Sequence, residues 1–365
     1  MILSVLSSVY GAAASWRRRW YARDPARQRR LTKPVVSVGN LRVGGTGKTP
    51  VVAHLCELLL AHGERPAILT RGYGRTRPTD GVTIVSNGKQ IIAGLASAGD
   101  EPLLLARLLP SVPILVGTDR FQCGQHAERD FDITVHVLDD GFQHTSLARD
   151  IDIVIVTPDD LTGRRLPLGR LRSPVSALAD ADAVIVDRST DDARAEVARL
   201  VSADARVFEL ERVLGAPLPL EPDRGWSGEP RESTNSATGR RVIAFAGIAG
   251  PDRFADTLRA SGWDVAELVA FPDHHRYERK DLDRVATAVS STGAVGALTT
   301  EKDAMRLLRL RPLPVPIASI PGVERPTLRS AGFGAWCRNA PGSSTSNVRS
   351  ARRFRWNRRG PHPPA

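Results

Sequence analysis

Residues 35–49 read VVSVGNLRVGGTGKT, so an apolar run is followed at once by a glycine-rich loop and a Lys-Thr pair. Val35–Val38 predicts a short buried strand, and Thr49–Ala61 predicts the helix that follows. Glycines at Gly44, Gly45 and Gly47 let backbone N–H groups curl around phosphate oxygens at the start of that helix. The segment therefore predicts a phosphate-binding loop of the P-loop type.

Two side chains at the end of this loop carry chemistry. Lys48 would reach the β- and γ-phosphates of ATP, and the Thr49 hydroxyl would bind Mg²⁺. The expected nucleotide-binding residues are Gly44, Gly45, Thr46, Gly47, Lys48 and Thr49. The strict pattern has a glycine where this chain has Arg42, so the loop is a variant. The alternative is a glycine-rich turn with a chance Lys-Thr pair, but the flanking strand and helix favour phosphate binding.

The rest of the chain alternates short apolar runs with helical stretches. We expect strands at 67–70, 82–85, 114–116, 134–138, 151–156 and 183–186, and a helix that begins near Glu101. Residues 211–240 are rich in Pro, Gly, Ser and Thr, and a second alternation follows over 242–246, 252–261, 265–269, 279–291 and 295–298. Apolar strands separated by helices are typical of a parallel sheet covered by helices on both faces.

These patterns predict an α/β protein with a P-loop NTPase-type parallel sheet, a second, smaller α/β domain and an N-terminal interfacial helix. We expect an N-terminal basic segment over 1–33, a P-loop domain over 34–210, a linker over 211–240, a second domain over 241–325 that contributes to the active-site cleft, and a C-terminal segment over 326–365. The end of that last segment is rich in Ser, Arg and Pro, a composition typical of disorder.

The net charge of +11 is concentrated at the two ends of the chain. Residues 1–33 hold eight Arg or Lys and one acid, residues 338–365 hold seven Arg and no acid, and the 304 residues between them carry a net charge of −3. Such basic blocks suit an anionic surface, either phospholipid head groups or nucleic acid. The three cysteines are far apart, which argues against a disulfide framework and favours a reducing compartment.

The first 16 residues place apolar side chains at helical spacing, and Arg17, Arg18 and Arg19 follow directly. No stretch reaches the roughly 20 apolar residues that a spanning helix needs. The segment predicts an interfacial helix whose aromatic rings lie at head-group depth and whose arginines reach phosphates. Two alternatives are a helix that only packs on its own domain and a cleaved signal peptide, although a signal peptide carries its charges before the apolar part.

Carboxylates follow two of the predicted elements. Asp139 and Asp140 come directly after the strand over 134–138, the place where P-loop enzymes hold Mg²⁺. Two successive side chains point to opposite sides, so one carboxylate is expected to bind the metal directly and the other through water or substrate. The alternative is an Asp-Gly turn that caps the next helix. In the segment Gly99-Asp100-Glu101-Pro102, the proline marks a helix start, so Asp100 or Glu101 is either its N-cap or, for Asp100, a catalytic base.

His274 and His275 lie in a predicted loop of the second domain, where the residues alone leave open a zinc site or plain surface. Several arginines in loops after strands could neutralise phosphate charge: Arg71, Arg75, Arg120, Arg170 and Arg172.

Eight segments between about residues 34 and 305 together resemble the tetraacyldisaccharide 4′-kinase family, the lipid A kinases of Gram-negative bacteria. They are Gly39-Asn40-Leu41 with Gly44–Pro50, Thr70-Arg71-Gly72-Tyr73-Gly74, Gly99-Asp100-Glu101-Pro102, Asp139–His144, Leu166–Arg172, Phe245-Ala246-Gly247-Ile248, Asp273-His274 and Thr300–Ala304. The order of the segments makes the resemblance specific. The chain departs from it at Ser173, where the family often has Glu, and in its Arg-rich tail.

The resemblance implies an ATP- and Mg²⁺-dependent kinase that phosphorylates the 4′-hydroxyl of tetraacyldisaccharide 1-phosphate to give lipid IVA in lipid A biosynthesis. It implies that Asp100 accepts the proton of the sugar hydroxyl, that His274 orients or tunes Asp100, and that Arg120 and Arg172 stabilise the transferring phosphoryl group. It also implies a peripheral location at the cytoplasmic face of the inner membrane, on an anionic surface. No nucleic-acid partner and no obligate protein partner are expected.

Two other classes fit the residues less well. A metallochaperone GTPase would need an Asn/Thr-Lys-x-Asp guanine site, and Thr300-Glu301-Lys302-Asp303 has the wrong spacing. A non-catalytic protein that binds nucleic acid or membranes would leave the phosphate loop and the paired aspartates unexplained.

Overall fold

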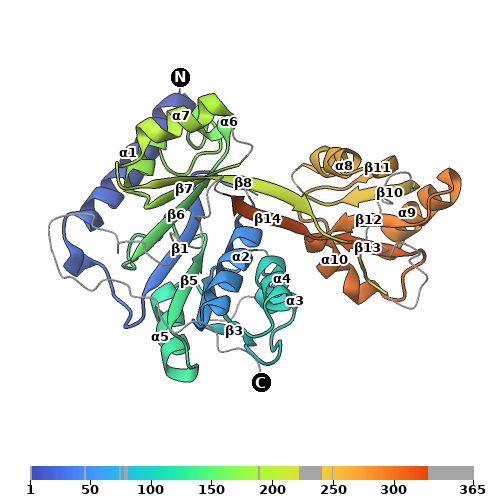
Figure 1. Ribbon diagram of the computed structural model, residues 1–365, viewed down its shortest axis with the longest axis horizontal. Coiled ribbons are helices and arrows are strands. Elements are labelled where there is room, and N and C mark those ends of the chain that lie inside the picture. Colours follow the sequence, from blue (N-terminus) through green and yellow to red (C-terminus); the bar gives the residue numbers. More distant parts are fainter. Residues whose placement is uncertain are drawn as a thin grey trace. The chain divides into compact units, whose positions relative to one another are not determined.

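The computed structural model describes residues 2–44, 47–73, 75–77, 81–187, 190–221, 241–248 and 250–327. The chain forms two compact units (Figure 1). The first unit contains the residues up to Glu211 and those from Glu324 onward, and the second unit runs from Arg212 to Val323. The chain therefore passes between the units within two strands, β8 (Arg206–Leu214) and β14 (Gly322–Thr327).

The first unit is built on a nine-stranded sheet with the order β14-β8-β7-β6-β1-β5-β2-β4-β3. The remaining strands are β1 (Val35–Asn40), β2 (Pro66–Thr70), β3 (Thr83–Asn87), β4 (Pro113–Val116), β5 (Val135–Asp139), β6 (Ile151–Val156) and β7 (Ala183–Asp187). Strand β1 lies between β5 and β6 and is parallel to both, with Val36 opposite Val137 on one side and Ile151 on the other. The expected α/β fold with a large, mostly parallel sheet flanked by helices is confirmed.

The helices of this unit are α1 (Ile2–Ala22), α2 (Lys48–Ala61), α3 (Leu95–Ala98), α4 (Asp100–Leu108), α5 (Arg120–Asp130), α6 (Pro158–Leu161) and α7 (Asp191–Leu200). Successive side chains of a strand point to opposite faces of the sheet. The helices that pack against successive residues therefore cover opposite faces. Val36 and Val38 pack with α2 and α4, whereas Val35 packs with α5. Both faces of the sheet are therefore buried, which explains why its strands are apolar throughout.

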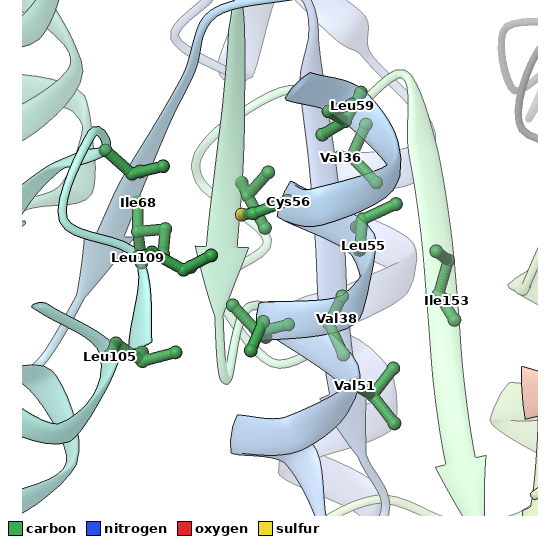
Figure 2. Close-up of a cluster of buried hydrophobic side chains, with 14 of the residues drawn as sticks. Val36, Val38, Val51, Leu55, Cys56, Leu59, Ile68, Leu105, Leu109 and Ile153 are labelled. Atoms are coloured by element: carbon green, nitrogen blue, oxygen red, sulfur yellow. The ribbon is translucent and has the colours of Figure 1, made fainter. Parts of the chain in front are cut away.

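Helix α2 is held against the sheet by one row of apolar side chains. Figure 2 shows Val51, Leu55 and Leu59 of α2 beside Val36 and Val38 of β1. All five are at most 2% exposed, and each such side chain contributes about 1.5–3 kcal/mol on burial. This packing fixes the start of α2, and with it Lys48, relative to the end of β1.

Helix α1 is fastened to the first unit by polar contacts. The Ser7 hydroxyl donates to the Arg165 carbonyl at 3.0 Å, and Arg18 pairs with Asp180. The Arg18 guanidinium also lies over the Phe142 ring, 4.1 Å from its centroid. The helix extends beyond the expected residues 1–16, and Arg18 is engaged by the protein itself. The expectation that arginines of this helix reach lipid phosphates stays a prediction.

The second unit is a five-stranded sheet with the order β11-β10-β12-β13-β9. Its strands are β9 (Leu218–Pro219), β10 (Arg241–Ala246), β11 (Asp264–Ala270), β12 (Ala297–Thr300) and β13 (Ile317–Ile320), and its helices are α8 (Pro251–Ala260), α9 (Arg279–Thr292) and α10 (Glu301–Leu307). Strands β10 to β13 are parallel and β9 is antiparallel to β13. Phe245 and Tyr277 lie fully buried in its core.

Two local expectations are wrong. The strand expected at 82–85 is β3, and it runs antiparallel to β4 at the sheet edge. The expected linker begins too early, because β8 continues to Leu214 and Leu218–Pro219 pairs with β13; residues 222–240 of that linker lie outside the described residues. The C-terminal tail from residue 328 also lies outside them.

Candidate active site

The sequence-predicted residues of the first unit gather at one edge of its sheet. Strands β1, β2, β4 and β5 are neighbours and parallel, so their carboxyl ends meet at the same edge. These ends are Asn40, Thr70, Val116 and Asp139. The chain order moves from β1 across to β2 and β4 and then returns to β5, so this edge is a topological switch point, where α/β proteins bind ligands.

The glycine-rich loop joins β1 to α2 at this edge. Gly44 has φ 106° and Gly47 has φ 74°, both in the left-handed region that favours glycine. Gly47 precedes the first residue of α2, so Lys48 and Thr49 lie in the first turn of the helix, with Thr49 buried. Gly45 and Thr46 lie outside the described residues. The described part has the geometry that phosphate binding at a helix N-terminus requires.

Asp140 holds two cations of this edge together. Arg172 donates to both Asp140 carboxylate oxygens at 2.6 and 2.8 Å and to the Asn40 side chain at 2.6 Å. The Lys48 ammonium lies 3.5 Å from Asp140. Burial by itself would raise the pKa of Asp140, but the Arg172 hydrogen bonds and the charge of Lys48 outweigh it and lower the pKa to about 2. Asp140 therefore stays ionised across the physiological range.

Asp139 has a contrasting environment one residue earlier. It is 2% exposed, and its Oδ2 accepts a hydrogen bond from the Thr70 hydroxyl at 3.0 Å. Its Oδ1 is buried without a hydrogen-bond partner in the described part of the chain. Burial raises the pKa of Asp139 to about 6, and the charge of Glu101 adds to the rise. The pKa of Asp139 is thus above the ordinary value of an aspartate, and that of the adjacent Asp140 is below it.

Asp100 is the first residue of α4 and is buried. Gly99 occupies the N-cap position, so the alternative in which Asp100 or Glu101 caps the helix is wrong. A Cβ atom on Gly99 would come within 2.4 Å of the Tyr73 carbonyl oxygen, and Gly99 has φ 88°. Glycine is required there because the loop after β2 packs directly on the start of α4, which brings two of the family-like segments together.

Arg120 lies at the start of α5 and is buried at the same edge. It donates to the Thr118 carbonyl at 3.0 Å. Burial, and then the positive charge of Arg71, lower the pKa of the Arg120 guanidinium, while the charges of Asp140 and Asp139 act in the other direction. Arg71, Arg120 and the paired aspartates therefore influence one another electrostatically, as expected of a site that binds phosphate groups.

Arg42, at the position where the strict phosphate-loop pattern has glycine, has a structural partner. Its guanidinium donates to Asp160 and to the Thr157 hydroxyl, both at 3.3 Å, and both ion-pair side chains are almost fully buried. The neighbouring backbone is bonded to the segment that carries Arg172, through Arg172 N–H to the Leu41 carbonyl at 2.7 Å. The variant residue thus braces the loop against the chain around residues 157–172.

Replacing Arg42 with alanine is expected to lower the free energy of unfolding by about 3 kcal/mol, because the Asp160 carboxylate would stay buried without its ion-pair partner. Urea unfolding monitored by circular dichroism measures this. The matched control is Arg30→Ala, which removes a largely exposed pair with Asp150 at 3.2 Å and should change the free energy by less than about 1 kcal/mol. Equal effects of the two variants would contradict the bracing role.

A cavity of about 370 Å³ lies between α1 and the segment around residue 172. Its lining includes Arg17, Arg18 and Arg19 on α1 and Arg172, Ser173 and Gln143 on the opposite wall. The Gln143 amide donates to the Asn40 carbonyl at 2.6 Å and to the Ser173 hydroxyl at 3.3 Å. Arg172 therefore contacts Asp140 and also lines this basic cavity.

The structure brings together Lys48, Thr49, Asp100, Arg120, Asp139, Asp140 and Arg172 at one edge of the first unit. His274 belongs to the second unit, where its Nδ1 lies 3.2 Å from the Arg306 guanidinium. No group of three or more His, Cys, Asp or Glu suited to a metal occurs in the described ranges, so the zinc alternative for the histidine pair has no support there. Asn40 and Glu101 also lie at this site and were not expected there. Asn40 is the last residue of β1 and Glu101 is the second residue of α4, so their positions at the ends of these elements were the available signal.

A glycine-rich strand-to-helix loop beside paired aspartates and buried arginines, on the switch-point edge of an α/β sheet, is the arrangement expected of a phosphotransferase. The family model described as tetraacyldisaccharide-1-P 4′-kinase matches residues 1–323. The chain belongs to that family, and it is a kinase.

Known proteins resemble the chain over most of its length. The tetraacyldisaccharide 4′-kinase of Geobacter metallireducens is 41% identical over 309 residues, which cover 84% of this chain and 88% of that protein. The corresponding kinase of Syntrophus aciditrophicus is 38% identical over 327 residues, covering 87% and 86%. The crystal structure of LpxK from Aquifex aeolicus in complex with ATP is 31% identical, with a TM-score of 0.69 and coverage of 89% of this chain and 95% of that one. The resemblance inferred from the ordered segments is confirmed.

Proposed function

We propose that the chain transfers the γ-phosphate of ATP to the 4′-hydroxyl of tetraacyldisaccharide 1-phosphate and so forms lipid IVA in lipid A biosynthesis. The observation that carries the proposal is the position of Arg172. Its guanidinium holds Asp140, which contacts Lys48, and it also lines the basic cavity beside α1. One side chain thus links the nucleotide-phosphate loop to a cavity suited to a phosphorylated sugar.

The residues of the site have complementary roles in this reaction. Lys48 would bind the phosphates of ATP, and Arg120 and Arg172 would stabilise the charge on the transferring phosphoryl group. Asp100 would accept the proton of the sugar hydroxyl, with His274 orienting it. Phosphoryl transfer depends mostly on alignment and charge neutralisation, and buried cations on a rigid sheet edge supply both.

The carboxylates at this edge fit a magnesium ion. Asp139 offers a buried oxygen that has no partner among the described residues, and Thr49 lies in the first turn of α2. Both oxygens of Asp140 already accept from Arg172, so Asp140 would reach the metal through its remaining lone pairs or through water. Mg²⁺ is usually held by one or two carboxylates together with phosphate oxygens, and it would offset the phosphate charge.

Helix α1 supports a peripheral position at the cytoplasmic face of the inner membrane, on an anionic surface. No helix in the described residues is long and apolar enough to cross a membrane. The exposed apolar side chains of α1 include Val9, Tyr10, Trp16 and Trp20. The Trp16 and Trp20 rings are stacked, with their centroids 6.3 Å apart. Exposed tryptophans next to arginines are typical of helices that lie in a membrane interface.

Replacing both Trp16 and Trp20 with alanine is expected to raise the apparent KM for the lipid substrate by about tenfold or more, with kcat little changed. Each indole contributes about 1.5–3 kcal/mol when it is buried in the interface. Steady-state kinetics in mixed micelles and co-sedimentation with anionic vesicles measure the two effects. The double Trp→Phe variant is the matched control and should retain most of the binding. A fall in kcat at unchanged KM would argue against membrane docking by these rings.

The direct test uses γ-labelled ATP, Mg²⁺ and detergent-dispersed tetraacyldisaccharide 1-phosphate. Label should appear in a doubly phosphorylated lipid and should be lost in the Lys48→Ala and Asp100→Ala variants. A folded, ATP-binding protein that transfers no label to this lipid would overturn the proposed substrate.

A further inference from the structure

Three family-like segments of the second unit end at one place, and only one of them has a proposed role. Gly247 follows β10, His274 follows β11, and Thr300 ends β12. These three strands are parallel neighbours, so their carboxyl ends meet at one edge. The proposed reaction gives no role to Gly247 or Asp303, which belong to two of these segments. Both are hydrogen-bonded to Arg306, which also contacts His274.

Arg306 is the centre of this cluster. Its guanidinium donates to Asp303 Oδ1 at 2.9 Å, to the Gly247 carbonyl at 3.0 Å and towards His274 Nδ1 at 3.2 Å. Asp303 is fully buried and Arg306 is 7% exposed. Asp303 is held in turn by the Gly247 N–H and the Thr300 hydroxyl, which donate to its Oδ2 at 3.0 and 2.8 Å. The guanidinium is therefore fixed on a rigid support.

The backbone holds His274 in an unusual conformation. His274 has φ 58°, in the left-handed region, and its N–H donates to the Gly247 carbonyl at 3.0 Å. Such a conformation persists only where the surroundings determine it. A Cβ atom on Gly247 would lie 3.2 Å from Asp303 Oδ1 and 3.0 Å from the His275 Cβ, so a side chain there would crowd the cluster.

The contact with Arg306 decides which ring nitrogen of His274 carries the proton. A guanidinium has only donors and does not lose its proton in proteins, so Nδ1 must accept. In a neutral imidazole the proton is then on Nε2. This nitrogen lies 3.9 Å from Asp273 Oδ1, and the His274 side chain is about half exposed.

We propose that Arg306, anchored by Asp303 and Gly247, is a positioning residue that fixes His274 in the tautomer with its proton on Nε2. His274 then acts as a hydrogen-bond donor through Nε2 and cannot take a proton at Nδ1 while the Arg306 contact persists. The inference rests on the proposed function in so far as His274 takes part in phosphoryl transfer, but the tautomer itself does not depend on it.

The first test is the tautomer in the full-length, unmodified protein. Long-range ¹H–¹⁵N correlation spectra of protein labelled with ¹⁵N-histidine report which ring nitrogen is protonated, and the signals lost in His274→Ala assign the residue. At a pH above the ordinary histidine pKa we expect the Nε2-H pattern. A pattern with the proton on Nδ1 would overturn the proposal, and this result needs no Arg306 variant to fold.

The second test separates positioning from a general structural role. Arg306→Lys keeps the charge but lacks the planar guanidinium fork that reaches Asp303, Gly247 and His274 at once, so kcat should fall by roughly 10- to 100-fold with little change in KM. Arg309→Lys is the matched control: Arg309 lies three residues further along the chain and donates to the Tyr277 carbonyl at 2.5 Å, so kcat should change by less than about twofold.

In a His274→Ala background, Arg306→Lys should cause no further loss of kcat, because an effect transmitted through His274 disappears with it. Losses that add in the double variant would overturn the proposal. Arg306→Met keeps much of the stem but removes every donor to Nδ1, so part of the His274 signal should change from the Nε2-H to the Nδ1-H pattern. If the unmodified protein transfers no phosphate to the lipid, the proposed function fails, and the tautomer measurement still decides this inference.

Discussion

Replacing Lys48 with methionine is expected to lower kcat by roughly 10²–10³-fold, because one cation that would stabilise the transferring phosphoryl group is lost. Methionine keeps most of the volume of the lysine stem. Asp140 would keep its two hydrogen bonds from Arg172, so the site should stay folded. Transfer of label from γ-labelled ATP to the lipid measures the loss, and thermal unfolding checks that the fold is retained.

The matched control for this variant is Lys280→Met. Lys280 also lies in the first turn of a helix, α9, and also faces a carboxylate, Glu278, at 3.0 Å. It belongs to the second unit and is largely exposed. We expect its kcat to equal that of the unmodified protein. A Lys48→Met protein that transfers phosphate at the normal rate would refute the assignment of the loop.

Replacing Asp139 with asparagine is expected to have two opposite effects. The kcat should fall by roughly 10²–10³-fold, because the oxygen proposed to ligate Mg²⁺ becomes part of a neutral amide. Without nucleotide or Mg²⁺, however, the folded protein should become more stable, by at most about 3 kcal/mol. Burial raises the pKa of Asp139 from its ordinary value of 3.8 to about 6, so the ionised carboxylate destabilises the native state.

The sign of this effect depends on pH in a defined way. Above pH 6, Asp139 is ionised in the folded and the unfolded chain, and the unfavourable burial of its charge is fully present. As the pH falls from about 6 towards 3.8, the folded protein takes up a proton and this destabilisation disappears. The difference in Tm between Asp139→Asn and the unmodified protein should therefore be largest above pH 6 and vanish in acid.

Asp187→Asn is the control for this comparison. Asp187 is also a buried carboxylate at the last residue of a strand of the same sheet, β7, but it lies outside the proposed site. Its replacement should leave kcat within about twofold. If Asp139→Asn lowered the Tm above pH 6, the account of its pKa would be wrong.

The parts of the fold that rest on local pattern could be predicted from the sequence. β-Branched runs marked the strands of the first sheet, and the segment over residues 35–49 marked the glycine-rich loop between β1 and α2, because each signal lies within a few residues. Helix α10 was missed although a signal existed: the Thr300 hydroxyl caps it by accepting from the Asp303 N–H at 3.2 Å. Thr-x-x-Asp at the start of a helix is a capping pattern that can be recognised in the sequence.

The parts that depend on contacts between distant residues could not be predicted. Arg42 and Asp160 are 118 residues apart, and nothing near either one indicates the other. The same holds for Arg306 and His274, separated by 32 residues. The pKa difference between Asp139 and Asp140 also follows from partners that folding brings close to them. The two residues are both aspartates at neighbouring positions, so the sequence does not distinguish them.

The fastening of α1 has a consequence for how the enzyme would meet its substrate. Arg18 ties the helix to Asp180 and Phe142, and the same helix forms one wall of the cavity that Arg172 lines. A bilayer that bound α1 as proposed would therefore also hold the cavity close to the lipid head groups. The search for substrate would then be two-dimensional, and turnover should follow the mole fraction of substrate within the lipid surface, not its bulk concentration.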